Sequence, residues 1–343
     1  MKLLKKAAFE SCVLATRVLT RLRAPVIRVF HLDPALRRKC EAVVRLLKQH
    51  GLEAERVEGL SRASRILLAG TDDLWVGLWN SVPLELLPRN YIFWNGEPVH
   101  HERWEDEEWD VQVPAGQPLR WHESAAHRKA WKLAERGAQA VWEYICSGQA
   151  GATQDPSRHA YVPFGYDRWY EEVFASARAA AASEPEIDVL FFGWGTERRR
   201  VILDQLRARG VNVMVADEKR PAVGEELEKL AARSKIVLGI YGYDDPNTHV
   251  PDLARFDFVF ANRIFVISEQ TKGLFQDLDY NAHVTVCGHE GLVDACLHYL
   301  QHPALRAEAA ERTYQWFRKS CCMEDFIPFE RIQALRDQVR QVC

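Results

Sequence analysis

Residues 187–217 read IDVLFFGWGTERRRVILDQLRARGVNVMVAD. The segment opens with a short apolar run, 187–193, that predicts a buried strand. A turn with two glycines follows, and a helix is expected to start near Thr196 and to end before Gly210. A second apolar run at 211–217 predicts another strand. The order strand, helix, strand is typical of a βαβ unit in a parallel sheet.

The same alternation continues on both sides of this unit. The expected strands lie at 25–32, 65–70, 90–95, 159–164, 235–241, 264–268 and 283–287. The expected helices lie at 34–50, 124–140, 222–233, 252–261, 289–301, 303–319 and 329–341. Because strands alternate with helices and are apolar on both faces, we predict an α/β fold. It has two Rossmann-like domains that face a cleft, each built on a parallel sheet.

Chain length and one break in composition divide the sequence. A length of 343 residues suits two domains of ordinary size. The Ala-rich stretch 176–186, which contains Pro185, marks the break between them. We therefore expect four parts: an amphipathic basic helix at 1–24, a first domain at 25–175, a second domain at 187–310, and C-terminal helices at 311–343 that pack back on the first domain.

Composition excludes several classes of protein. With 45 basic and 48 acidic residues the formal charge is −3, which gives no global reason to expect a nucleic-acid partner. The sequence has no run of about 18 apolar residues, so no membrane span is expected. Its eight cysteines form no CxxC pair. We expect a reduced cytoplasmic protein whose cysteines hold no metal.

The N-terminal segment 1–23 has apolar residues at helical spacing and carries six basic residues and one acidic residue. Glu10, Arg17 and Arg21 interrupt its apolar positions, which argues against a signal peptide. Two interpretations remain open. The segment is either a basic amphipathic helix in peripheral contact with an anionic membrane, at the inner face, or a helix docked on its own protein.

The turn after the first strand of the βαβ unit is the sharpest candidate site. Gly193 and Gly195 let a ligand approach the main chain, and Thr196 is a suitable N-cap. The helix N-terminus would offer N–H groups and a positive dipole end to a phosphate. Arg198 and Arg199 could add bidentate contacts to a diphosphate. Successive helix residues fan out, so at most two of the three arginines at 198–200 can face the ligand.

The same turn is also a partial G-x-G-x-x-G fingerprint, in which Arg198 stands at the third glycine's place. Asp217 ends the next strand, where a ribose-binding acid would lie. An NAD-dependent oxidoreductase is therefore a rival hypothesis. Two features weaken it: the third position normally needs a small residue, and the unit follows a complete α/β domain.

The sequence resembles the two-domain GT-B glycosyltransferases, specifically the bacterial group similar to spore-maturation-protein glycosyltransferases. Four stretches carry this resemblance: NYIFWNGEP (90–98), YVPFGYD (161–167), DVLFFGWGTERRRVILDQLRARGVNV (188–213), and KIVLGIY through DLARFDFVFANRIFVISE (235–269). The C-terminal stretch at 297–317, LxxxxHPALRAEAAERTYQWF, also resembles that group's tail, and together these stretches cover most of residues 65–330.

The resemblance implies a glycosyltransferase that holds a nucleotide-sugar donor in the second domain and an acceptor in the first. It implies no metal and no cofactor besides the donor, such as a UDP-, GDP- or dTDP-sugar. Basic side chains and a helix N-terminus would stabilise the leaving nucleoside diphosphate. The likeness favours retention of the anomeric configuration. The acceptor would be a glycan, a protein or a small molecule.

The resemblance also assigns donor contacts. The group's Glu-x-x-Arg pattern falls on Asp252 and Arg255, with the shorter Asp in place of Glu. Its strand-ending acid falls on Glu269, whose carboxylate could accept both hydroxyls of a ribose. The Gly-containing turn before that strand is replaced by residues 261–263, Ala-Asn-Arg.

On the first-domain side, Glu97, His100 and His101 follow an expected strand and are the catalytic candidates, as a base or as a partner of a sugar hydroxyl. Their spacing fits no common metal motif. Tyr241 and Tyr243 follow another strand and could stack on a nucleotide base. Packing and solvated-loop roles are the alternative for all five. The departures at Asp252 and 261–263 keep a third hypothesis open: a GT-B-like protein that binds a nucleotide or carbohydrate without turnover.

Overall fold

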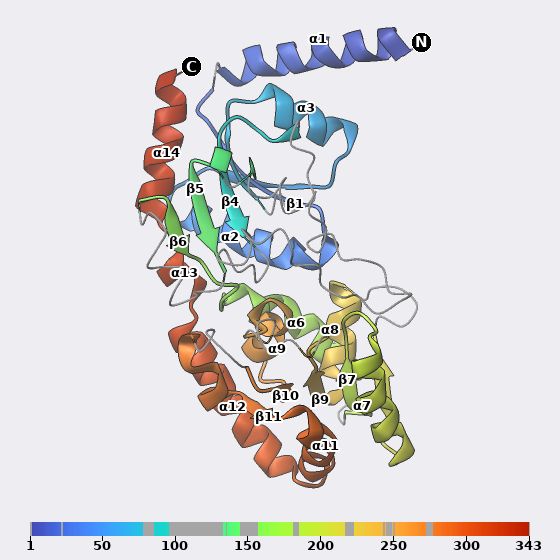
Figure 1. Ribbon diagram of the computed structural model, residues 1–343. Helices are drawn as coiled ribbons and strands as arrows, with labels where there is room; N and C mark the ends of the chain where they lie inside the picture. The colour runs from blue at the N-terminus through green and yellow to red at the C-terminus, as the bar shows by residue number, and fades with distance from the viewer. Residues whose placement is uncertain are drawn as a thin grey trace. The chain divides into compact units, whose positions relative to one another are not determined.

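The structure is a computed structural model (Figure 1). It describes residues 2–21, 23–77, 86–95, 133–134, 136–144, 157–180, 185–216, 223–242, 244, 249, 251–271 and 277–342. The chain forms two compact units. Unit 1 comprises Met1–Tyr144, Ala150–Tyr161 and Ile327–Cys343, and unit 2 comprises Ile145–Gln149 and Val162–Phe326.

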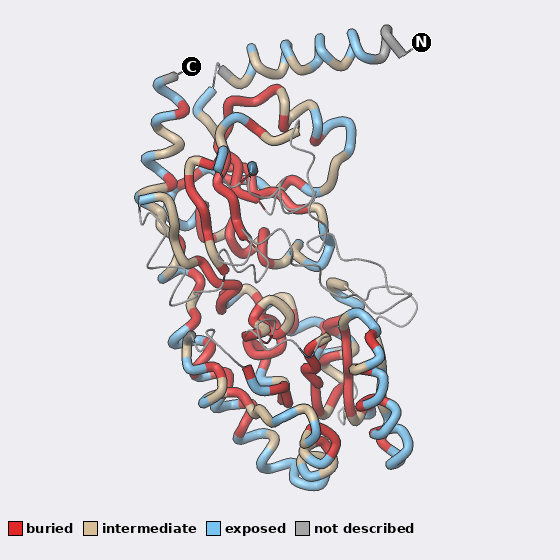
Figure 2. Tube along the Cα trace, in the orientation of Figure 1, coloured by how far each residue is buried: buried red, intermediate tan, exposed pale blue. Residues whose placement is uncertain are grey.

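Unit 1 is built on a six-stranded parallel sheet with the order β2-β1-β3-β4-β5-β6. The strands are β1 (Ile27–His31), β2 (Ala54–Glu58), β3 (Leu74–Gly77), β4 (Tyr91–Asn95), β5 (Ala140–Glu143) and β6 (His159–Tyr161). Its helices are α1 (Lys2–Arg21), η1 (Pro34–Leu36), α2 (Arg37–Gln49), α3 (Arg62–Gly70) and α14 (Phe329–Val342). Strands β1, β3 and β4 are buried along their whole length, as a sheet covered on both faces requires (Figure 2).

One predicted strand is wrong. Residues 65–70 lie in helix α3, whose N-cap Ser61 accepts a hydrogen bond from the Ser64 N–H at 3.1 Å. The apolar run there is too short to distinguish a strand from one face of a helix. The capping serine was the signal that favoured the helix. The next strand in the sheet is the buried run 74–77, and the sequence pattern predicted neither this strand nor β2 nor β5.

Unit 2 is built on a five-stranded parallel sheet with the order β11-β10-β9-β7-β8. The strands are β7 (Ile187–Phe191), β8 (Val213–Val215), β9 (Ser234–Gly239), β10 (Val266–Glu269) and β11 (Thr285–Cys287). Its helices are α6 (Trp169–Ala180), α7 (Glu197–Ala208), α8 (Glu225–Ala232), α9 (Leu253–Ala261), η7 (Asp277–Asp279), α10 (Tyr280–His283), η8 (His289–Gly291), α11 (Leu292–Gln301), α12 (Pro303–Ser320) and α13 (Met323–Phe326). The predicted βαβ unit is present as β7, α7 and β8.

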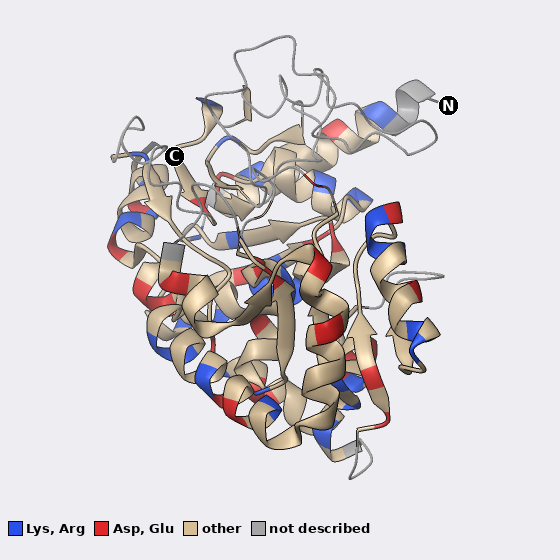
Figure 3. Ribbon diagram, turned by 60° about the horizontal axis from the view of Figure 1, so that its bottom comes forward, with Lys and Arg blue, Asp and Glu red and all other residues tan. Residues whose placement is uncertain are grey.

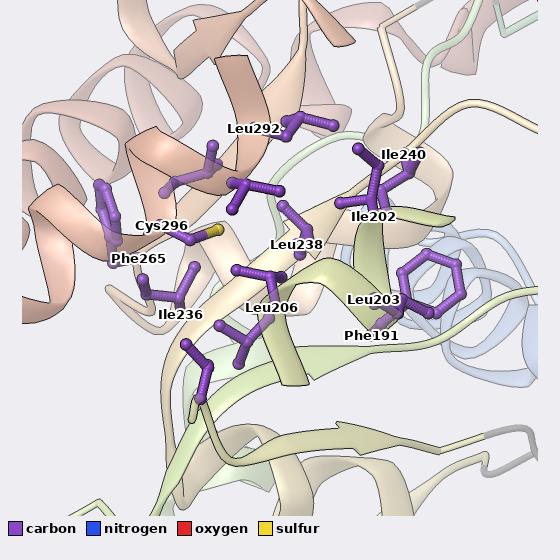
Figure 4. Close-up of a cluster of buried hydrophobic side chains, with 14 of the residues drawn as sticks. Phe191, Ile202, Leu203, Leu206, Ile236, Leu238, Ile240, Phe265, Leu292 and Cys296 are labelled. Atoms are coloured by element: carbon purple, nitrogen blue, oxygen red, sulfur yellow. The ribbon is translucent and has the colours of Figure 1, made fainter. Parts of the chain in front are cut away.

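The core of unit 2 joins the sheet to α7 and α11. Phe191, Ile236 and Leu238 from the strands pack with Leu206 and Cys296 from the two helices (Figure 4). The outer surfaces of the helices carry interspersed acidic and basic residues (Figure 3). This partition of apolar and charged residues accounts for the helical spacing seen in the sequence.

Gly239 marks the closest approach inside this sheet. A Cβ there would lie 2.8 Å from Ser268 Oγ and 2.9 Å from Phe256 Cζ, so only glycine fits between β10 and α9. The close approach brings the start of α9 near the carboxyl end of β9.

Two parallel sheets with covering helices confirm the predicted fold class. The last helix, α14, belongs to unit 1, where the Phe329 ring stacks on His50 with centroids 3.7 Å apart. By contrast, α12 belongs to unit 2. Residues 176–180, expected in a break, lie in helix α6, because Ala is the best helix former. Within the described part of the chain, no helix is long and apolar enough to cross a membrane.

Candidate functional site

The order of strands in unit 2 contains a switch point. From β7 the chain passes to β8 on one side, and it then returns to β9 on the other side of β7. The loops that leave the carboxyl ends of β7 and β9 therefore diverge. In open parallel sheets this crevice is where ligands bind. Both loops belong to unit 2, so the site can be described within that unit alone.

The loop after β7 has the form expected of an anion-binding turn. Gly193 has φ +134°, a conformation that favours glycine. Thr196 caps α7, accepting a hydrogen bond from the Arg199 N–H at 3.4 Å, as predicted. The first turn of α7 brings its N–H groups to this edge of the sheet. Trp194, in the middle of the loop, is 76% exposed.

The three consecutive arginines diverge. Arg199 is buried, and its guanidinium donates to the carbonyls of Ile240 and Trp194 at 2.9 and 2.7 Å. Arg199 thereby joins the loop after β7 to the loop after β9. Arg200 points away from both loops and pairs with Glu197 on the exposed face of α7. Arg198 reaches across the switch point to the end of β10.

Glu269 is the last residue of β10 and is only 3% exposed. Its carboxylate accepts a bidentate pair from Arg198 at 2.5 and 2.6 Å and the Tyr241 N–H at 2.6 Å. His289 Nδ1 lies 3.2 Å from Oε1. Burial raises the pKa of Glu269, but the Arg198 and Tyr241 hydrogen bonds outweigh it, so the pKa lies below its ordinary value. In this arrangement both carboxylate oxygens already accept hydrogen bonds within the protein.

Arg255 supplies a further cation near the first loop. Its Nη2 pairs with Asp252 at 2.9 Å, within the first turn of α9. Its Nη1 is buried and has no hydrogen-bond partner among the described residues. A Cβ built on Gly193 would lie 3.5 Å from Arg199 Nη1 and 3.7 Å from Arg255 Cζ. Two guanidinium groups thus face the bare α-carbon of Gly193, beside a helix N-terminus.

Tyr241 closes the loop after β9. Its ring is buried and stacks on His249, with centroids 4.3 Å apart and planes 10° apart. Burial raises the pKa of its hydroxyl well above the ordinary value. The backbone of Tyr241 also contributes, because its carbonyl accepts from Arg198 at 2.9 Å.

The structure brings together eight of the predicted site residues within unit 2: Gly193, Thr196, Arg198, Arg199, Tyr241, Asp252, Arg255 and Glu269. Gly195 lies in the same loop. His289, next to Glu269, was not predicted as a site residue. Its signal in the sequence was its place two residues after a strand, at the same carboxyl edge.

Other candidates cannot be placed. Glu97, His100, His101, Asp217 and Tyr243 lie outside the described residues. Among the residues that the structure does describe, no three His, Cys, Asp or Glu side chains gather as a metal site would require.

Comparison with known proteins agrees on the fold. No family model matches the chain. One curated relative, the uncharacterized protein L140 of Acanthamoeba polyphaga mimivirus, is 31% identical over 143 residues. That match covers 41% of this chain and 45% of the relative, less than half the length of either protein.

Solved structures match nearly the whole chain. Sucrose-phosphate synthase from Thermosynechococcus elongatus has a TM-score of 0.57 at 13% identity, covering 94% of this chain and 100% of its own. Anabaena HepE in complex with UDP-glucose has a TM-score of 0.54 at 11% identity, covering 92% and 98%. WaaG, a glycosyltransferase of lipopolysaccharide biosynthesis, has a TM-score of 0.51 at 11% identity, covering 92% and 99%. The chain therefore has the GT-B type of fold.

Proposed function

We propose that this chain is a glycosyltransferase whose unit 2 binds a nucleotide-sugar donor at the switch point between β7 and β9. The carrying observation is the pair of guanidinium groups, Arg199 and Arg255, that face Gly193 beside the N-terminus of α7. Arg255 Nη1 is buried and has no partner in the part of the chain that the structure describes, so it calls for an acceptor, and a diphosphate oxygen is one. The fold shared with WaaG and the UDP-glucose complex of HepE supports a donor of this class.

The diphosphate would lie on the Gly193 turn. There it would accept from the N–H groups of the first turn of α7 and from Arg255. As the bond between the sugar's anomeric carbon and the diphosphate oxygen breaks, negative charge grows on that oxygen, and the fixed donors stabilise it. The acceptor's hydroxyl oxygen forms the new bond to the anomeric carbon, and its proton passes to a base.

Arg198 gives the site two states. In the structure its guanidinium is held by Glu269. A bound diphosphate would compete for Arg198 and leave Glu269 free to accept the hydroxyls of the ribose. This exchange reconciles the predicted ribose role of Glu269 with a carboxylate whose oxygens already accept hydrogen bonds in the structure.

The finer features of the proposal come from the sequence. We propose a metal-independent reaction with retention, a place in the spore-maturation-like group of bacterial enzymes, and a cytoplasmic location. The acceptor-side base is proposed among Glu97, His100 and His101. Arg198, Arg255 and the helix N-terminus supply the positive charge that a metal provides in other transferases.

A binding protein without turnover is the second candidate. It is favoured by the Asp252–Arg255 pair, because an Asp that is committed to its own arginine is too short and too occupied to hold a sugar. The two candidates share the nucleotide site and differ in catalysis.

Thermal shift with UDP, GDP, dTDP, CDP and NAD tests the site, because a ligand that binds only the folded state raises its melting temperature. We expect one nucleoside diphosphate to stabilise the protein and the matching nucleoside, which lacks phosphates, to have no effect. Stabilisation by NAD alone would favour the oxidoreductase instead. Hydrolysis or transfer of the donor then separates the enzyme from the binder.

Two neighbouring arginines provide a matched test of the diphosphate contact. Arg198→Met should weaken binding of the stabilising nucleotide by about tenfold or more, because a charge-assisted hydrogen bond is lost. Arg200→Met, two residues along the same helix, should leave the affinity unchanged. Titration calorimetry, at a temperature below the melting temperatures of both variants, measures these affinities. Equal affinities in the two variants would remove Arg198 from the site.

A further inference from the structure

Helix α1 is docked on unit 1 by one face only. Phe9, Val13 and Thr16 are half-buried on that face. The contact with α3 is close at Gly70, where a Cβ would lie 2.9 Å from the Val13 carbonyl oxygen and 3.1 Å from Thr16 Cβ. Arg17 Nη2 also donates to the carbonyl of Ala69 at 2.9 Å. The docked interpretation of the N-terminal segment is thus correct for this face.

The opposite face of α1 is apolar and exposed. Leu14, Val18 and Leu19 are 62%, 56% and 66% exposed, and the contacts that α1 makes with the described residues of unit 1 lie on the other side of the helix. On a helical projection Ala8, Cys12 and Ala15 fall on the same broad face, and no charged residue does. Ser11, the polar residue within it, donates its hydroxyl to the Ala7 carbonyl at 3.0 Å, which satisfies the hydroxyl within the helix. We call this surface the outer face.

The segment that contains α1 has a net positive charge. Residues 1–23 contain six basic residues and one acidic residue. Glu10, the acidic one, is paired with Lys6 at 3.9 Å. Two copies of such a segment would repel each other if their outer faces met. A surface of negative charge above an apolar layer would attract the same segment.

We propose that α1 lies in the plane of an anionic lipid surface, with its outer face at the boundary between headgroups and acyl chains. The exposed apolar face, the net positive charge of residues 1–23 and the docked inner face together match an interfacial helix. The close contact at Gly70 would transmit this attachment to the rest of unit 1. This proposal does not depend on the transfer reaction, because none of its residues belongs to the donor site.

Flotation of the full chain with vesicles tests the proposal. Vesicles of phosphatidylcholine with phosphatidylglycerol should carry the protein upward, vesicles of phosphatidylcholine alone should not, and added salt should weaken the binding. The variant Leu14→Gln/Val18→Gln/Leu19→Gln should bind about tenfold more weakly or worse. The matched control Val201→Gln/Met214→Gln/Leu305→Gln changes three exposed apolar residues of unit 2 and should bind like the unaltered chain.

Three outcomes would overturn the proposal. The first is equal vesicle binding by the α1 variant at an unchanged melting temperature. The second is binding that does not depend on anionic lipid. The third is a dimer in size-exclusion chromatography that the α1 variant dissociates, since the outer face would then pair copies of this chain.

Discussion

Each unit contains a buried arginine–carboxylate network, but the two networks lie at opposite edges of their sheets. In unit 1 Asp73 precedes β3 and is 1% exposed. It accepts from Arg28 at 2.6 Å, from Arg23 at 2.8 Å and from the Val26 N–H at 2.9 Å. This network ties together the amino ends of β1 and β3. In unit 2 the Glu269 network ties together the carboxyl ends of β9 and β10 with α7.

An arginine–carboxylate network is therefore expected to stabilise the fold in unit 1 and to contribute to ligand binding in unit 2. Ligands of parallel α/β sheets bind at the carboxyl edge, so a network at the amino edge has only the fold to stabilise. A network at the carboxyl edge can also exchange partners with a ligand. The side chain of Arg198 is 16% exposed and that of Arg28 is 6% exposed, which gives a ligand more access to the former.

The largest expected effect is at the amino edge of unit 1. Asp73→Asn should lower the free energy of unfolding by about 3 kcal/mol, because the buried Arg28 loses its buried carboxylate partner and keeps only the exposed Glu55, while the exposed Arg23 loses the same partner. Urea unfolding measures this loss. The exposed pair Asp204–Arg207 offers the control Asp204→Asn, which should change stability by less than about 0.5 kcal/mol. The nucleotide-induced thermal shift of Asp73→Asn should match that of the unaltered chain. A lost shift in a folded variant would break the comparison.

Compared with Asp73→Asn, Glu269→Gln should change the free energy of unfolding less and nucleotide binding more. The amide keeps an acceptor for the Tyr241 N–H but leaves Arg198 without its charged partner, at a cost of about 1–3 kcal/mol. The thermal shift produced by the nucleotide should change in this variant. An unchanged shift would mean that the carboxyl-edge network is as purely structural as the one around Asp73.

The pH dependence of stability follows from the sign of the Glu269 pKa shift. The folded pKa lies below the ordinary value, so the contribution of Glu269 is complete above the unfolded pKa of about 4.3 and is lost as pH falls through the folded pKa. The stability difference between the unaltered chain and Glu269→Gln should therefore be largest near neutral pH. It should shrink as the pH is lowered to about 3. A constant difference across this range would show that the carboxylate carries no charge-dependent interaction.

The smallest expected effect is at the amino edge of unit 2. Arg263 occupies the residue after the C-cap of α9 with φ +56°, where glycine is usual, and Ile264 N–H bonds back to the Val259 carbonyl at 3.1 Å. Its side chain lies over Tyr314 and pairs with Glu311 at 2.7 Å. Arg263→Gly should be more stable than Arg263→Ala by about 1 kcal/mol, because only glycine removes the left-handed strain. Neither variant should alter the nucleotide response, as measured by thermal shift.

The sequence was most informative where chemistry is local. A few neighbouring residues were enough to place Thr196 as a cap between a strand and a helix. They also placed Gly193 in the turn before it. The helix at 62–70 was missed because its apolar run is short, although Ser61 offered a local capping signal. The Arg198–Glu269 pair joins residues 71 positions apart. Its geometry depends on the strand order, which periodicity does not encode.

The sequence predicted that Glu269 ends a strand. It did not predict the hydrogen bonds that the Glu269 carboxylate accepts within the protein. Those depend on the Tyr241 N–H and on His289, which arrive from two other strand ends. Because successive helix residues fan out, the sequence predicted that the three arginines would point in different directions. It did not predict which of the three would be buried. Arg199 is the buried one, and its guanidinium carbon lies 5.4 Å from the centroid of the Phe191 ring.

The grouping of residues 327–343 with unit 1 has a consequence for biosynthesis. On the ribosome, the segment that contributes Phe329 to the stack with His50 emerges after all of unit 2. The whole of unit 2 is then available to fold while unit 1 still lacks α14. We expect a released chain truncated after residue 326 to contain a protease-resistant unit 2 beside a unit 1 that is cleaved easily.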